Sequence, residues 1–174
     1  LDIAIIYLKS SLVTKDSISI TTPFKVKIPS GEFSRLGHIG QSYQITQWFA
    51  KPAVFDKNGW HPMSYLDQGE FYSEFGDYDV SITVPKNYVL MATGDLQNKE
   101  ELDFLHKKAE MTSKLIQENK LPIRDSSGRK DMSFPNSSKE KKTLRFIQEN
   151  VHDFAWFADK RYHVLKGEVK LESK

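Results

Sequence analysis

The chain has 174 residues, of which 39% are hydrophobic and 28% charged, so its composition is that of a folded protein rather than a disordered one. The net charge of +2 gives little long-range attraction to nucleic acid, which we exclude as a partner. No stretch approaches the roughly 18 apolar residues that a membrane-spanning helix needs, so we expect no membrane span. Because the chain contains no cysteine, disulfides and thiolate ligands are excluded.

The two ends of the chain look truncated. The first residues form an apolar run without an initiator methionine, and the last residues alternate like an unfinished strand. We therefore expect a fragment or a processed piece of a longer protein. Such a piece does not reveal the targeting signal of its parent, so the compartment stays open, with bacterial export slightly favoured over the cytoplasm.

Alternating side chains predict strands in the first third of the chain. The positions that share one phase are Ile18, Ile20, Thr22, Phe24, Val26 and Ile28. This period of two predicts a half-buried strand, or a bent pair of strands, over 18–28. We expect a glycine-rich loop over 30–42, a strand over 44–49 and an irregular, packed, aromatic excursion over 51–76.

A β-hairpin is predicted next. The residues of one phase are Tyr78, Val80, Ile82 and Val84, and polar residues stand between them. Residues 85–87, with the sequence Pro-Lys-Asn, are typical of a turn. Residues 88–93 then return as the second strand of the hairpin.

The pattern changes to that of a helix at Asn98. This residue can act as an N-cap, with Glu101 three residues further on. Apolar residues then recur near helical spacing through Asn119, and Pro122 marks the end of the helix. The Ser- and Lys-rich residues 124–140 have little to bury, so they predict a mobile loop.

Strand periodicity returns at 144–146, 154–158 and 162–171. The order of strands, one helix-plus-loop insertion and further strands favours an all-β sandwich over a βαβ fold. We treat the chain as a single incomplete β domain. Its parts are strands and an aromatic loop (1–97), a helical and disordered insertion (98–142) and returning strands (143–174).

No catalytic or metal-binding motif is recognisable from spacing. The histidines, none of which has zinc-motif spacing, are His38, His61, His106, His152 and His163. The carboxylates of Asp67, Glu70 and Glu74 could serve glycoside chemistry, but their spacing fits a solvated turn equally well. The basic stretch from Arg124 to Lys142 lacks the glycines of a phosphate-binding loop, so we interpret it as solvated. Asn136 begins a glycosylation sequon, which is a weak pattern.

Aromatic side chains are dense between residues 48 and 65. They are Trp48, Phe49, Phe55, Trp60 and Tyr65. Such a group could form a platform for a sugar or a base, but aromatic residues most often pack a loop against a sheet, which we favour here.

Several short blocks, taken in order, resemble a known protein family. The blocks are GHIGQSYQITQWF at 37–49, KPAVFD at 51–56, GWHP at 59–62, YLDQGEFYSEFG at 65–76, YDVSITVP at 78–85, ATG at 92–94 and NVHDFAWFA at 150–158. Together they resemble the N-terminal domain of bacterial zinc aminopeptidases of the aminopeptidase N and leukotriene hydrolase family, which are gluzincin metallopeptidases.

The resemblance implies a saddle-like β-sandwich domain that precedes a thermolysin-like catalytic domain. In that family the zinc ligands, an H-E-x-x-H motif and a further Glu, lie in the catalytic domain, as does the G-x-M-E-N exopeptidase motif. This chain contains none of these motifs, so we expect no catalytic residue and no metal ligand in it. The parent is expected to remove N-terminal residues from peptides, with the peptide substrate and its own catalytic domain as partners.

The resemblance also implies one substrate-binding residue, Gln44. In the family, a Glu or Gln upstream of a Pro/Asp turn reaches into the active site and binds the free amino group of the substrate. Counting back from Asp56 places this position at Gln44, whose amide oxygen can accept a hydrogen bond from an ammonium group. The commoner family pattern has arginines and an F-P-C-x-D-E-P turn where residues 48–56 stand here. The alternative role for Gln44 is that of a strand residue that bonds a neighbour.

Two other functions remain open. One is a free-standing β-sandwich module that binds carbohydrate or peptide through Trp48, Trp60 and Tyr65. The other is a catalytically inactive scaffold that has kept the N-terminal domain of the family. Only the downstream sequence would distinguish such a scaffold from an active aminopeptidase.

The composition of residues 124–140 leads to a prediction about dynamics. Because this segment has few apolar side chains to bury, its amides should exchange with solvent faster than those of any other internal segment. Hydrogen exchange measured by mass spectrometry checks this, and strong protection across the segment would contradict it.

Overall fold

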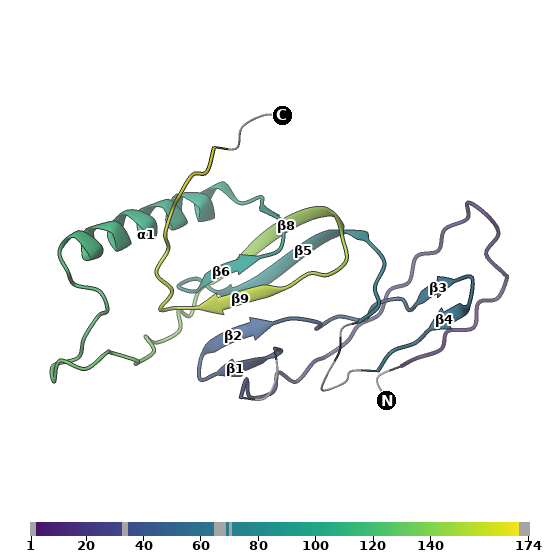
Figure 1. Ribbon diagram of the computed structural model, residues 1–174, viewed down its shortest axis with the longest axis horizontal. Coiled ribbons are helices and arrows are strands. Elements are labelled where there is room, and N and C mark those ends of the chain that lie inside the picture. The colour runs from purple at the N-terminus through teal and green to yellow at the C-terminus, as the bar shows by residue number, and fades with distance from the viewer. Residues whose placement is uncertain (1–2, 33–34, 65–68, 70, 171–174) are drawn as a thin grey trace.

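The structure is a computed structural model that describes residues 3–32, 35–64, 69 and 71–170 (Figure 1). In this part of the chain the elements, in order, are β1 (Gly37–Ile39), β2 (Ser42–Ile45), β3 (Val54–Asp56), β4 (Gly59–His61), β5 (Gly76–Pro85), β6 (Val89–Ala92), β7 (Asp95–Leu96), α1 (Lys99–Gln117), β8 (Lys141–Val151) and β9 (Trp156–Asp159). The predicted mainly-β class with one helix is confirmed.

All the strand pairs are antiparallel, and they form three sheets in the described part of the chain. A four-stranded sheet has the order β1-β2-β9-β6, and a three-stranded sheet has the order β5-β8-β7. The remaining pair, β3 and β4, forms a separate two-stranded hairpin. The longest pairing joins β5 to β8, from Gly76 opposite Val151 to Pro85 opposite Lys141.

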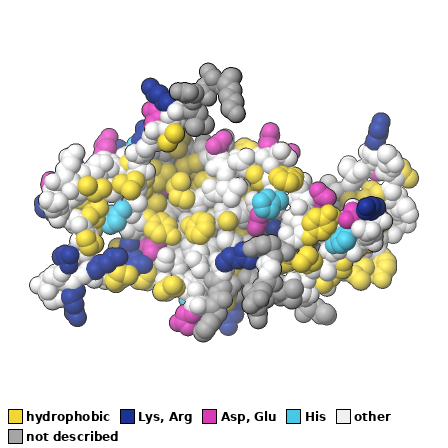
Figure 2. Space-filling view, in the orientation of Figure 1, with side chains coloured by type: hydrophobic (Ala, Val, Ile, Leu, Met, Phe, Trp, Pro, Cys, Tyr) yellow, Lys and Arg dark blue, Asp and Glu magenta, His cyan; other side chains and the backbone are white. Residues whose placement is uncertain are grey.

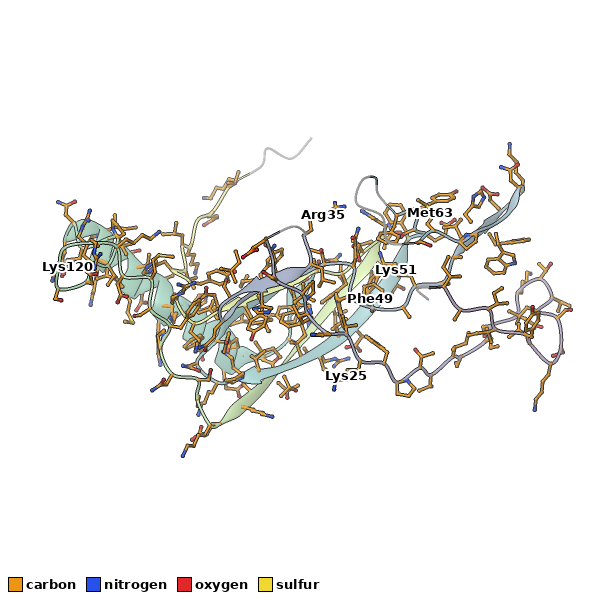
Figure 3. The ribbon with its side chains drawn as sticks, turned by 90° about the horizontal axis from the view of Figure 1, so that it is seen from below. Lys25, Arg35, Phe49, Lys51, Met63 and Lys120 are labelled. Atoms are coloured by element: carbon orange, nitrogen blue, oxygen red, sulfur yellow. The ribbon has the colours of Figure 1, made fainter. Side chains whose placement is uncertain are left out.

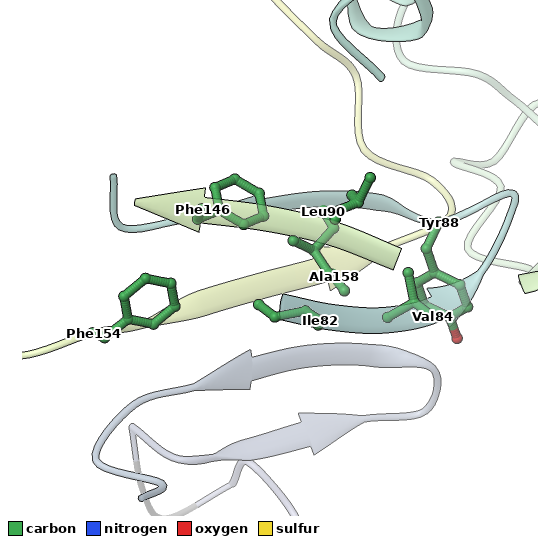
Figure 4. Packing of buried hydrophobic residues seen from close by; sticks show 8 residues of the cluster. Ile82, Val84, Tyr88, Leu90, Phe146, Phe154 and Ala158 are labelled. Carbon is green, nitrogen blue, oxygen red and sulfur yellow. The ribbon is translucent and has the colours of Figure 1, made fainter. Parts of the chain in front are cut away.

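One hydrophobic core lies between the four-stranded and the three-stranded sheet (Figure 4). Its buried members are Ile82, Val84, Tyr88, Leu90, Leu144, Phe146, Phe154 and Ala158. Six of them lie on strands of the two sheets, where alternate residues point to the same face, and Tyr88 and Phe154 lie just before β6 and β9. Burying a side chain such as Phe146 or Leu90 contributes about 1.5–3 kcal/mol, so this core holds the two sheets together.

The predicted hairpin over residues 78–93 is wrong, although both strands exist. The turn forms, with the Tyr88 N–H donating to the Pro85 carbonyl at 3.0 Å. However, β5 pairs with β8, whereas β6 pairs with β9 in the other sheet. The turn signal fixes only the reversal of the chain, while the choice of partner depends on strands some 60 residues further along.

The predicted strands over 18–28 and 162–171 are also wrong for the described residues. Residues 3–29 and 162–170 contain no strand, and most of their side chains are exposed; Leu171 lies outside the described part. Alternation specifies which side chains share a face, but a strand also needs a neighbouring edge with which to bond. In Figure 1 the first of these segments extends past the β3–β4 hairpin.

Two shorter expectations change in detail. The strand predicted over 44–49 is β2, which starts at Ser42 and ends at Ile45, because Gln47 takes a left-handed backbone conformation with φ of 52°. The loop predicted over 30–42 contains β1. The irregular excursion over 51–76 contains the β3–β4 hairpin, whose aromatic side chains are exposed rather than packed.

The predicted helix is confirmed as α1, but Asn98 stabilises its start in an unexpected way. The Asn98 side chain makes no capping hydrogen bond to the helix. Instead, its amide nitrogen donates to the Thr143 carbonyl at 3.2 Å, and its oxygen accepts from the Arg145 N–H at 2.8 Å. Asn98 therefore joins the start of the helix to β8.

A buried ion pair also joins α1 to β8. The Lys142 ammonium lies 2.6 Å from a carboxylate oxygen of Glu101, and both side chains are largely buried. The same ammonium lies 4.4 Å from the centre of the Phe104 ring. Sequence analysis predicts a capping role for Glu101, but its carboxylate bonds this lysine.

The loop that follows α1 has two different halves. Asp125, Ser127 and Arg129 bond mainly to one another in an exposed turn. In the second half, the Pro135 carbonyl and the Ser137 hydroxyl accept hydrogen bonds from Lys160, a buried lysine. We therefore expect the fastest exchange in the first half.

The Glu101–Lys142 pair allows a test of what holds the helix to the sheet. Lys142→Met leaves the Glu101 carboxylate buried without its partner, so we expect a loss of about 3–5 kcal/mol in the free energy of unfolding. The double variant Glu101→Leu/Lys142→Met should recover most of that loss. Urea unfolding measures both.

Lys86→Met is the matched control, because the Lys86–Glu140 pair is also a short ion pair but is exposed. It should change stability little. If Lys142→Met is no more destabilising than Lys86→Met, the buried pair does not hold the helix.

Candidate functional site

The residue that the family resemblance singles out, Gln44, lies in the middle of a sheet. It belongs to β2, opposite Gly37 of β1 on one side and Phe157 of β9 on the other. Its neighbours Tyr43 and Ile45 are directed inward, since Tyr43 packs on the core and Ile45 is fully buried. Because side chains alternate along a strand, Gln44 lies on the outer face of the four-stranded sheet.

The outer face beside Gln44 is apolar. The register continues from Gln44 to Phe157 and on to Met91 of β6, so these three residues form one row across the sheet. Phe157 is 41% exposed and Met91 is 51% exposed. This row thus combines one amide with two exposed apolar side chains.

Two glycines allow the chain to pass close beside Gln44. A Cβ atom at Gly37 would lie 2.5 Å from the Cα of Gly31, so a larger residue there would force the two segments apart. The Gly31 N–H donates to the His38 carbonyl at 2.9 Å, which fixes residues 29–31 against β1. A Cβ at Gly31 would lie 3.5 Å from the amide nitrogen of Gln44. Main chain therefore forms one wall beside this amide.

The second half of α1 and the neighbouring part of the same outer face line one groove. Ser42, two residues before Gln44, and Asp159, two residues after Phe157, line a groove together with Thr112 of α1. The Asp159 side chain is buried there. Gln44, Phe157 and Met91 do not line this groove.

The predicted aromatic platform does not form as one surface. Trp48 is packed: its indole nitrogen donates to the Phe154 carbonyl at 3.1 Å, and its ring lies 5.4 Å from that of Phe49. Trp60, in contrast, lies on β4 of the separate hairpin and is 67% exposed. Tyr65 lies outside the described residues. The packing interpretation therefore holds for Trp48 but not for Trp60.

The β3–β4 hairpin carries different chemistry on its side chains. Trp60 lies opposite Phe55, with ring centres 4.9 Å apart, and Phe55 is 64% exposed. The His61 ring nitrogen lies 2.8 Å from a carboxylate oxygen of Asp56, which also accepts from the Asn58 N–H. These two hydrogen bonds lower the pKa of Asp56, with the His61 bond as the larger cause.

The other chemical candidates do not come together in the described residues. Asp67 and Glu70 lie outside them, and Glu74 is exposed. His38 bonds the Gly40 carbonyl, and His152 packs against the Phe75 ring. Among the residues described, no three His, Cys, Asp or Glu side chains are grouped so that they could hold a metal ion.

Sequence analysis missed Lys51, which joins three parts of the chain. Its ammonium lies 3.0 Å from a carboxylate oxygen of Asp153 and 5.3 Å from the centre of the Phe49 ring. It also contacts the Phe71 ring and the Ser73 hydroxyl. Figure 3 shows Phe49 and Lys51 side by side. A single lysine within an aromatic run is the only signal that could have indicated this role.

Comparisons with protein-family models, with curated proteins and with solved structures find no match for this chain. The helix of the described part is not both long and apolar enough to cross a membrane.

The Asp56–His61 contact predicts how the hairpin responds to acid. Because the folded hairpin lowers the pKa of Asp56, its carboxylate stabilises the hairpin above the ordinary carboxylate range. This contribution disappears as the pH falls through the lowered pKa. We expect the NMR signal of the Trp60 indole N–H to shift in that acidic range and to lose this titration in Asp56→Asn.

Asp79→Asn is the control. Asp79 also has a lowered pKa, caused by its hydrogen bond to Arg145, but it lies on β5 in another sheet. The Trp60 signal should therefore titrate as in the wild type. A Trp60 titration that persists in Asp56→Asn would contradict the assignment.

Proposed function

We propose that this chain is the non-catalytic N-terminal domain of a zinc metallo-aminopeptidase, which shapes the substrate cleft and helps bind the peptide N-terminus. The ordered sequence blocks between Gly37 and Ala158 support the family. The observation that carries the role is the position of Gln44 on the outer face of its sheet, next to main chain and exposed apolar side chains.

In this proposal Gln44 binds the free amino group of the substrate. Its amide oxygen accepts a hydrogen bond from an N–H of the α-ammonium group, while the neighbouring Phe157 and Met91 contact the first side chain. A neutral amide attracts a cation less than a carboxylate does, so further recognition of the ammonium depends on groups of the catalytic domain.

The zinc ion belongs to that other domain. The described residues lack a group of donors that fits a zinc site, and the chain has no H-E-x-x-H motif. When bound in the parent, zinc supplies an activated water for peptide hydrolysis. The contribution of this chain is confined to binding and orienting the substrate.

Substitution of Gln44 in the intact parent tests the role. We expect Gln44→Ala to raise KM by about 10- to 100-fold, because a hydrogen bond to a charged group is worth about 1.5–3 kcal/mol. Gln44→Glu should lower KM, since a carboxylate pairs directly with the ammonium. Steady-state kinetics with several amino-acid substrates measures both effects.

Gln148→Ala is the matched control, because Gln148 is a partly exposed glutamine on β8 of the other sheet. Its kinetics should equal those of the wild type. Unchanged KM and kcat in Gln44→Ala would remove Gln44 from the site. A loss of thermal stability in Gln44→Ala with unchanged kinetics would assign it a structural role instead.

The exposed pair of Phe55 and Trp60 favours a second candidate function, a module that binds carbohydrate or peptide. Exposed aromatic faces of this kind can stack on a ligand. Binding of the chain to a glycan or peptide array that is lost in Trp60→Ala would support this alternative. No binding to either array would count against it.

A further inference from the structure

A groove of about 870 Å³ lies between α1, the loop that follows it and the segment after β9. Its apolar lining includes Met111, Leu115, Leu121, Ile123 and Met132. This volume and this mostly apolar lining are typical of pockets for small ligands. The groove does not include Gln44, so it is separate from the site proposed above.

One face of α1 forms a side of the groove. Lys108, Met111, Thr112 and Leu115 line it at intervals of three and four residues, which places them on one face of the helix. From Lys108 to Leu115 the helix rises about 10 Å. Lys108 thus lies at one end of an apolar stripe.

Lys108 is a half-buried cation for which the described residues provide no carboxylate. The nearby Glu101 is paired with Lys142. Lys108 itself lies 5.8 Å from the centre of the Phe104 ring, which Lys142 also contacts. Burial, and then the charge of Lys142, lowers the pKa of Lys108. An anion placed here would relieve both effects.

Most of the other charged groups of the groove have partners. Asp159 accepts two hydrogen bonds from the Arg161 guanidinium, and Asp131 accepts one from the Ser133 N–H. Lys160 donates to Gln41 and to the loop. Lys130 adds a further cation to the lining. In Figure 2, basic side chains gather over the loop that follows α1. The groove therefore offers positive charge to a ligand.

We propose that this groove binds an anionic amphiphile, a medium-chain carboxylate whose head pairs with Lys108 and whose tail lies along Met111 and Leu115. An acyl tail needs no hydrogen bonds, which fits the apolar lining. The polar groups there have partners already, such as the Thr112 hydroxyl, which donates to the Lys108 carbonyl at 2.9 Å. A peptide backbone would need such groups to be available.

Titration of the full chain with decanoate, followed by two-dimensional NMR and calorimetry, tests the proposal. We expect saturable one-to-one binding, with shifts confined to the lining of the groove. Decanol, which has a tail of the same length and no charge, should bind at least about tenfold more weakly. Lys108→Met should weaken decanoate binding by a similar factor and leave decanol binding unchanged.

Lys107→Met is the matched control, because Lys107 is the exposed neighbour on the same helix and does not line the groove. It should bind decanoate like the wild type. Met111→Asp places a carboxylate in the path of the tail and should abolish binding, whereas Leu102→Asp, on α1 outside the groove, should not. Met111 and Leu102 are both exposed, so both variants should fold.

Three results would overturn the proposal. The first is the lack of saturable decanoate binding. The second is equal binding of decanoate and decanol together with unchanged binding in Lys108→Met. The third is self-association of the chain, detected by sedimentation, that Met111→Asp abolishes, which would assign the groove to a second copy of the chain.

Discussion

A single stretch of the chain, residues 141–159, supplies the central strands of both main sheets. Within it, β8 pairs with β5 and β7, and β9 pairs with β2 and β6. Phe146 and Phe154, from this stretch, are fully buried between the sheets. The strands β2, β5, β6 and β7 each form hydrogen bonds with β8 or β9. Most of these contacts join residues far apart in sequence, which is typical of folds that form slowly.

The connection between β8 and β9 is held from the N-terminal part of the chain. Trp48 donates to the Phe154 carbonyl, and Lys51 pairs with Asp153 in the same connection. Both residues follow β2 closely, so the contacts that orient β9 also fix the end of β2. The position of Gln44 therefore depends on the packing around Phe154 as well as on its own strand.

Sequence predicts those elements whose signals are local. The alternation from Tyr78 to Val84 gave β5, and the helical spacing after Asn98 gave α1. Both patterns arise because one face of the element is buried, and the spacing of nearby apolar residues in the sequence reveals that face.

Sequence does not predict which strands pair or which polar groups meet. The alternation at 18–28 is as regular as that of β5, yet no neighbouring strand edge bonds it among the described residues. The pairing of β6 with β9 and the contact of Lys51 with Asp153 join residues 64 to 102 positions apart. For the candidate site, the family resemblance indicated Gln44. Only the structure shows that Gln44 lies on the outer face of its sheet, that main chain at Gly31 and Gly37 passes beside it, and that a groove lies nearby.

Three lysines with largely buried side chains have oxygen partners for their ammonium groups. Lys160 donates to oxygens of Gln41 and of the loop, Lys142 has Glu101, and Lys51 has Asp153. Each of these ammonium groups is largely buried, and each has the oxygen partners that offset the loss of water. Lys108 is also partly buried, but within the described chain it meets an aromatic ring and another cation. The same fold satisfies three similar groups, and the exception at the end of an apolar groove is where we propose that a ligand supplies the anion.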